Sequence, residues 1–145
     1  TKLYAMPGLR LGYLLSQNRQ LLMRIRQAGQ PWSVSEPAQQ AGIAALKEAD
    51  FREKTLALVD PERRRLSDFL TSLGFLVWPG RANYLSFRAP EEPCLYEKLL
   101  EQGILIRPLS NYHNLTKEDY RIAIRTPEEN NRLIQALQKL HPQMS

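Results

Sequence analysis

The stretch TKLYAMPGLRLGY, residues 1–13, decides the fold of this chain. Its Pro7-Gly8 dipeptide predicts a turn, because proline fixes its own backbone angle and glycine adopts conformations that other residues avoid. The apolar residues at 11–15 then predict a buried strand. Lys2 precedes the turn and Arg10 follows it, so we expect an amine and a guanidinium side by side on a rigid loop.

The residues of this loop suit one kind of cofactor. An amine next to a guanidinium fits a molecule that carries both an aldehyde and a phosphate, as pyridoxal 5'-phosphate does. Residues 2–12 resemble the cofactor-lysine segment of the fold-type I PLP-dependent aminotransferase superfamily (class I/II). Within it they are most similar to the branch of threonine-phosphate decarboxylases and histidinol-phosphate aminotransferases. The resemblance implies that Lys2 is the catalytic residue and binds the cofactor aldehyde, and that Arg10 binds the cofactor phosphate.

Two further arginines near the C-terminus are candidate substrate-binding residues. Apolar and other side chains alternate over 120–124, which places Arg121 on the face opposite the isoleucines. This strand and residues 126–130 resemble the family segment whose arginine binds the substrate carboxylate, which implies that role for Arg121. Arg107 ends the strand predicted at 104–107, where the decarboxylases of the branch have an arginine that helps to bind the anionic groups of the substrate. An arginine that only ends the strand is the open alternative for Arg107.

Helix caps and hydrophobic periodicity predict the remaining secondary structure. Asp60-Pro61 predicts a kink or a restart inside a long helix, because proline removes a backbone donor. Thr126 to Glu129 is a capping box that starts the last helix. The expected helices are one from an Asn18 cap to Ala28, one from a Ser35 cap to Lys47, and others over about 51–72, 93–102 and 127–140; the expected strands are 75–78, 84–87, 104–107 and 120–124.

These elements predict two parts. Residues 1–58 are expected to be the end of a larger cofactor-binding domain with its linker helix. Residues 59–145 are expected to form a small α+β domain, with a short sheet and helices packed on one face. The fold class is therefore α/β to α+β, the C-terminal portion of a fold-type I PLP enzyme. We expect the chain to be part of a longer enzyme, and to be inactive and to bind the cofactor weakly when alone.

Composition limits the classes of function. The hydrophobic content of 43% is that of a globular protein, and no apolar run approaches the roughly 20 residues that span a bilayer, so no membrane partner is expected. A single cysteine, Cys94, favours the cytoplasm, and no histidine has the spacing of a metal ligand, so no metal is expected. The net charge of +5 and the triplet at 63–65 leave a non-enzymatic basic nucleic-acid-binding module as an alternative of another class. We favour the interpretation that the triplet is a solvated helix face and that no nucleic acid binds.

The resemblance implies a homodimer that uses pyridoxal phosphate on a small phosphorylated amino acid. The first choice of reaction is the decarboxylation of L-threonine O-3-phosphate, which belongs to cobalamin biosynthesis. The alternative is histidinol-phosphate or a related aminotransferase. The two reactions differ in which bond at the substrate Cα is placed to break, and the sequence leaves that choice open.

Overall fold

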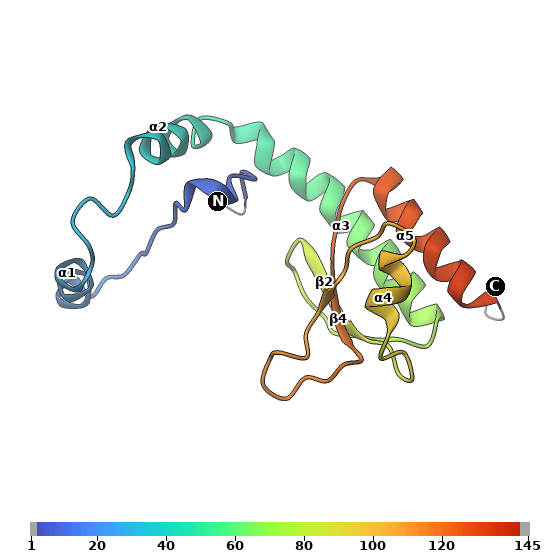
Figure 1. Cartoon of the computed structure of the whole chain (residues 1–145). Helices are drawn as coiled ribbons and strands as arrows, with labels where there is room; N and C mark the ends of the chain where they lie inside the picture. The colour runs from blue at the N-terminus through green and yellow to red at the C-terminus, as the bar shows by residue number, and fades with distance from the viewer. Residues whose placement is uncertain (1–2, 143–145) are drawn as a thin grey trace. The chain divides into compact units, whose positions relative to one another are not determined.

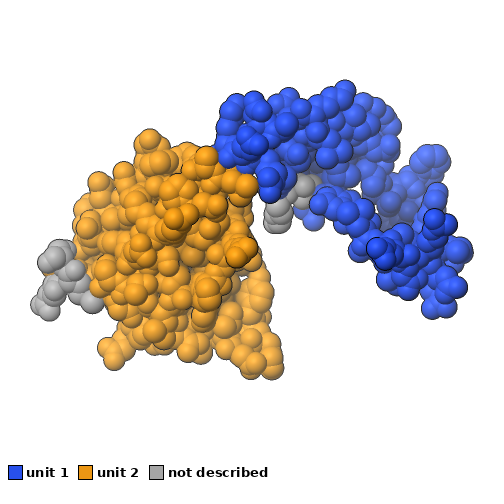
Figure 2. All heavy atoms as spheres, turned by 180° about the vertical axis from the view of Figure 1, so that it is seen from behind, with its two compact units in different colours: residues 1–55 blue, residues 56–145 orange. Residues whose placement is uncertain are grey.

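The computed structural model describes residues 3–142 and divides into two compact units, 1–55 and 56–145 (Figures 1 and 2). The assignment of residues 1–58 to a larger cofactor-binding domain stays a prediction. In chain order the elements are η1 (Pro7–Leu9), α1 (Arg19–Ala28), α2 (Glu36–Ala45), α3 (Ala49–Ser72), β1 (Leu76–Val77), β2 (Tyr84–Arg88), α4 (Leu95–Leu100), β3 (Arg107–Pro108), β4 (Asp119–Ala123) and α5 (Pro127–Leu140).

The first unit contains the predicted turn and the two short helices. Pro7 begins the short 3-10 helix η1, which confirms a turn at this dipeptide. The Asn18 side chain accepts a hydrogen bond from the backbone N–H of Leu21 at 3.0 Å, so α1 begins at the predicted cap. Ser35 caps α2 through its backbone position alone, since its side chain makes no capping bond. α2 ends at Ala45, two residues before the predicted end.

The strand predicted at 11–15 is wrong. Residues 11–15 have no strand assignment, and the side chains of Tyr13 and Leu15 are 90% and 84% exposed. A strand exists only where it pairs with a neighbouring strand, and the sheet in the described part of the chain consists of β1, β2, β4 and β3, without this segment. An apolar run alone therefore did not settle the backbone conformation.

Helix α3 is continuous from Ala49 to Ser72, with Pro61 inside it, so the predicted restart does not occur. The helix ends at Ser72, as predicted, and Gly74 just beyond it has a φ of +76°. The N–H of Phe75 donates to the carbonyl of Leu70 at 3.1 Å, and the N–H of Gly74 donates to that of Thr71 at 2.9 Å. This is a Schellman motif, in which a glycine takes the left-handed conformation and satisfies the last carbonyl groups.

The second unit contains a four-stranded antiparallel sheet in the order β1-β2-β4-β3. Helices α3, α4 and α5 pack on one face of this sheet (Figure 1), as their buried leucines require. The predicted small sheet with helices on one face is therefore confirmed. The core between the layers consists mainly of Leu66, Leu70, Phe75, Leu85, Phe87, Leu95, Leu99, Tyr120, Ile122, Leu133 and Leu137.

β3 is shorter than predicted and starts only at Arg107. Gly103, just before Ile104, has a φ of +74°, and the N–H of Ile104 donates to the carbonyl of Leu99 at 2.9 Å. The backbone N–H of Ile104 is thus hydrogen-bonded to the end of α4 and not to a strand. Only Arg107 and Pro108 pair with β4. No helix among residues 3–142 combines the length and the apolar content that crossing a bilayer requires.

Candidate anion-binding site on the open face of the sheet

The sheet places Arg107 and Arg121 directly opposite each other. Arg107 on β3 pairs with Arg121 on β4, and Ser86 on β2 pairs with Arg121 from the other side. Directly paired residues of an antiparallel sheet point to the same face. The three side chains therefore form a row across the sheet, which brings together the two predicted substrate-binding arginines.

The alternation along β4 determines which face carries this row. Tyr120 and Ile122 are buried at 1% and 4% exposure, because they point into the helix layer. Arg121 lies between them and is half-buried on the other face. The predicted alternation is therefore confirmed, and the arginine row lies on the face of the sheet that the three helices leave open.

Each of the two guanidinium groups lies over a tyrosine ring. The guanidinium carbon of Arg121 is 4.9 Å from the ring centroid of Tyr84, and that of Arg107 is 5.7 Å from the ring centroid of Tyr112. Arg107 Nη2 also donates to the Tyr112 hydroxyl at 3.4 Å. The sequence patterns did not indicate Tyr84 as a residue of this site. Tyr84 becomes a neighbour of Arg121 only through the pairing of β2 with β4, and the sequence of one strand does not show that pairing.

In the described part of the chain, carboxylates pair with four other arginines of the second unit but not with these two. Asp119 is fully buried and accepts hydrogen bonds from Arg88 Nε and Nη2 at 2.7 and 2.9 Å. These hydrogen bonds are the main reason why the pKa of Asp119 is held below its usual value. Neither Arg107 nor Arg121 forms an ion pair within residues 3–142. Two opposed cationic side chains without an acid partner make this row a candidate site for an anion with more than one charge.

The predicted cofactor residues belong to the other unit. Lys2 lies outside the described residues. Arg10 ends η1 in the left-handed conformation, with φ +52°, and its Nη1 donates to the carbonyl of Pro7 at 2.9 Å. Its guanidinium is exposed and makes no ion pair with any residue in the described part. The remaining N–H groups of Arg10 fit a phosphate, whose oxygens accept several hydrogen bonds.

The arginine triplet has a structural role. Arg63 pairs with Asp60 at 2.7 Å and donates to the carbonyl of Ala82 at 3.1 Å. Arg65 pairs with Glu62 at 2.7 Å. Because two of the three charges in the triplet are paired within α3, the triplet offers little free charge to a nucleic-acid backbone.

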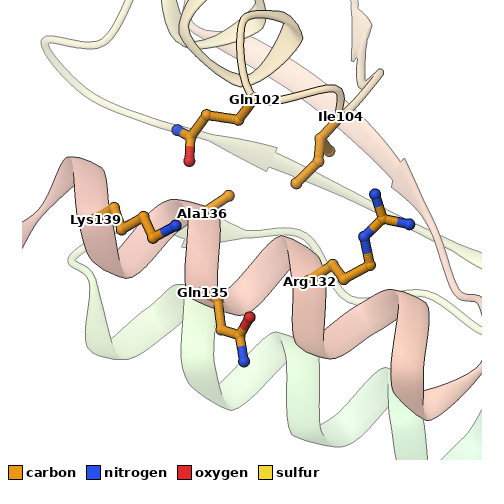
Figure 3. Close-up of a pocket in the computed structure, with 6 residues that line it drawn as sticks. All are labelled: Gln102, Ile104, Arg132, Gln135, Ala136 and Lys139. Carbon is orange, nitrogen blue, oxygen red and sulfur yellow. The ribbon is translucent and has the colours of Figure 1, made fainter.

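A shallow hollow in the helix layer is separate from the arginine row (Figure 3). It has a volume of about 290 Å³ and lies between α5 and the turn after α4. Its lining residues are Gln102, Ile104, Arg132, Gln135, Ala136 and Lys139. Neither Arg107 nor Arg121 contributes to it, so it is not the predicted substrate site. Within residues 3–142 no cluster of His, Cys, Asp or Glu could hold a metal ion.

Comparison with known proteins identifies the family. The family model of aminotransferase class I and II matches residues 1–137. The chain belongs to this aminotransferase family. It is 42% identical over 142 residues to threonine-phosphate decarboxylase of Salmonella typhimurium, covering 97% of this chain and 39% of that protein. It is 37% identical over 145 residues to histidinol-phosphate aminotransferase of Nitratidesulfovibrio vulgaris, covering 98% and 38%.

Among solved structures, the histidinol-phosphate aminotransferase from Clostridium acetobutylicum superposes with a TM-score of 0.90 at 31% identity, over 98% of this chain and 44% of that one. The aminotransferase resemblance and the fold inferred from it are therefore confirmed. Members of this family are pyridoxal phosphate enzymes. The chain spans about two fifths of the length of the relatives it matches, with 39% and 38% of the two proteins covered.

Proposed function

We propose that this chain is part of a PLP enzyme that decarboxylates L-threonine O-3-phosphate. Similarity to threonine-phosphate decarboxylase supports this substrate. The observation that carries the proposal is the opposed pair Arg107 and Arg121, which face each other without a carboxylate partner in the described part of the chain. A substrate with both a carboxylate and a phosphate supplies the two anionic groups that such a pair requires.

Arg121 and Arg107 divide the recognition of the substrate between them. Arg121 binds the carboxylate through its planar fork, and Arg107, on the neighbouring edge strand β3, binds the phosphate. With both ends of the substrate fixed, the bonds at its Cα keep one orientation. This orientation decides whether the carboxylate or the proton leaves the Cα.

Lys2 and Arg10 are the residues that hold the cofactor in this proposal. The Lys2 amine binds the aldehyde and afterwards carries a proton to or from the substrate Cα, while the Arg10 guanidinium binds the phosphate. When bound, pyridoxal phosphate supplies an electron sink for the electrons that the broken bond leaves behind. We place the whole protein in the cytoplasm as a homodimer that binds neither nucleic acid nor membrane.

A histidinol-phosphate aminotransferase is the second candidate, favoured by the relative of Nitratidesulfovibrio vulgaris and by the structure from Clostridium acetobutylicum. Product analysis separates the two. The whole protein with pyridoxal phosphate is incubated with L-threonine O-3-phosphate, and separately with histidinol phosphate and a 2-oxo acid. We expect carbon dioxide and an aminopropanol phosphate from the first mixture. Transfer of the amino group in the second mixture, with no carbon dioxide from the first, would select the aminotransferase.

The role of Arg121 is tested by a matched pair of variants. Arg121→Lys keeps the charge but loses the planar fork, so we expect kcat/KM to fall at least about tenfold. Arg125→Lys is the control, since Arg125 lies in the same segment and pairs with Glu129 at 2.6 Å. Equal values of kcat/KM in the two variants would contradict the role of Arg121.

A further inference from the structure

Six of the nine arginines of the second unit have a partner for their guanidinium in the described part of the chain, either a carboxylate or a ring; Arg64, Arg81 and Arg132 have neither. Carboxylates pair with Arg63, Arg65, Arg88 and Arg125, through Asp60, Glu62, Asp119 and Glu129 respectively. Arg107 and Arg121 instead lie over tyrosine rings. These two are also the arginines that face each other across β3 and β4.

Such a pair needs something to hold it in place. Like charges at directly opposed positions of a sheet repel each other, and a long arginine side chain on an open face has many rotamers. A carboxylate would fix the guanidinium but would also neutralise the charge that an anionic ligand needs. The face of an aromatic ring attracts a guanidinium and adds no charge of its own.

We propose that Tyr84 and Tyr112 are positioning residues that hold Arg121 and Arg107 in place and leave their charges free for an anion. Tyr84 and Tyr112 are 42% and 45% exposed, so neither ring is a core residue. The contact with a guanidinium explains why these two large rings remain partly exposed beside the arginine pair. The inference rests on the proposed function for the identity of the ligand, whereas the contacts between arginines and rings do not depend on it.

The register of β2 and β4 explains how Tyr84 reaches Arg121. Tyr84 pairs with Ala123, and Ser86 pairs with Arg121, so Tyr84 is the diagonal neighbour of Arg121 on the same face. The small side chain of Ala123 leaves space above β4. The 4.9 Å separation between the guanidinium carbon and the ring centroid lies within the range of a cation–π contact.

Variants at Tyr84 test the proposal in the whole protein with pyridoxal phosphate. Tyr84→Phe keeps the ring and is the matched control. Tyr84→Leu and Tyr84→Met remove the ring but keep an apolar side chain, and two such variants guard against misfolding of one. We expect both to raise KM for L-threonine O-3-phosphate about three- to tenfold with kcat within about twofold of wild type, and Tyr84→Phe to match wild type.

A second measurement does not need turnover. The affinity of the whole protein with pyridoxal phosphate for acetate, which offers Arg121 a carboxylate, should be about three- to tenfold weaker in Tyr84→Leu and unchanged in Tyr84→Phe, followed by NMR of the acetate signal. If wild type turns over neither phosphorylated substrate, the proposed function fails and acetate binding alone decides the role of Tyr84. Equal KM values in an active series, or acetate binding that is absent or equal in wild type and Tyr84→Leu, would overturn the positioning role.

Discussion

Replacing Tyr120 with phenylalanine should destabilise the second unit by a measurable and specific amount. The phenol is 1% exposed, and its hydroxyl donates to the carbonyl of Glu92 at 2.7 Å and accepts from the N–H of Leu95 at 3.2 Å. It thus connects β4 to the start of α4. Phenylalanine keeps the ring and opens no cavity, so only these two hydrogen bonds are lost.

Each neutral hydrogen bond contributes about 1 kcal/mol net. Leu95 and Glu92 keep one bond to each other, at 3.3 Å, which limits the loss to about 1.5–2 kcal/mol. With a urea m-value of about 2 kcal/mol/M, the midpoint should fall by about 0.8–1 M. Tyr96→Phe is the control, since Tyr96 packs against the same core and donates no side-chain hydrogen bond to a described residue. It should change stability by less than about 0.5 kcal/mol.

The pH dependence gives a second, independent readout of the Tyr120 variant. Burial is the main cause that raises the pKa of Tyr120 above its ordinary value. A phenol with a raised folded-state pKa contributes its full stability below the unfolded pKa of about 10 and loses it as the pH rises further. The stability gap between wild type and Tyr120→Phe should therefore narrow above pH 10. A Tyr120→Phe midpoint equal to that of Tyr96→Phe, or a gap that widens above pH 10, would refute this reasoning.

Further predictions concern the frame around the site and the cofactor. Glu62→Gln should lower the unfolding free energy by about 2 kcal/mol at pH 7, because this buried carboxylate accepts hydrogen bonds from Arg65 and Asn130. The hydrogen bond from Arg65 is the main cause that lowers the pKa of Glu62. The ionised Glu62 therefore stabilises the fold above about pH 4.3, and this stabilisation is lost as the pH falls further. The difference in unfolding free energy between wild type and Glu62→Gln should be smaller at pH 3 than at pH 7 in urea titrations. Gly74→Ala should cost about 1 kcal/mol, read from its urea midpoint, because φ is +76° there. Absorption titration of the 145-residue chain with pyridoxal phosphate should give no saturable spectral change; a tight one that Lys2→Ala abolishes would contradict weak binding by the chain alone.

Local signals predicted the helices well, because their ends are determined by a few neighbouring residues. The capping box is an example: the Thr126 side chain accepts from the N–H of Glu129, and the Glu129 carboxylate accepts from the N–H of Thr126. Strands were harder to predict because their partners lie far away in the sequence. The run at 11–15 has apolar side chains without a paired strand, and Ile104 gives its N–H to the end of α4.

The same difference between local signals and distant pairing applies to the residues of the candidate site. Alternation along one strand was enough to place Arg121 on the open face, whereas Arg107 was selected by the resemblance to the decarboxylases. The direct opposition of these two residues follows from the sheet order and register, which no single segment encodes. For the same reason the position of Tyr84 beside Arg121 emerged only from the paired strands.

The most direct test of the account compares phosphorylated and unphosphorylated substrate in the whole protein. We would measure kcat/KM for L-threonine O-3-phosphate and for L-threonine in wild type, in Arg107→Met and in the control Arg125→Met. The kcat/KM of Arg107→Met should fall at least about tenfold with the phosphorylated substrate, because one charge-assisted contact is lost. With threonine it should fall less than about threefold. An equal loss with both substrates, or no loss with either, would contradict the claim that the open face of the sheet recognises the substrate phosphate.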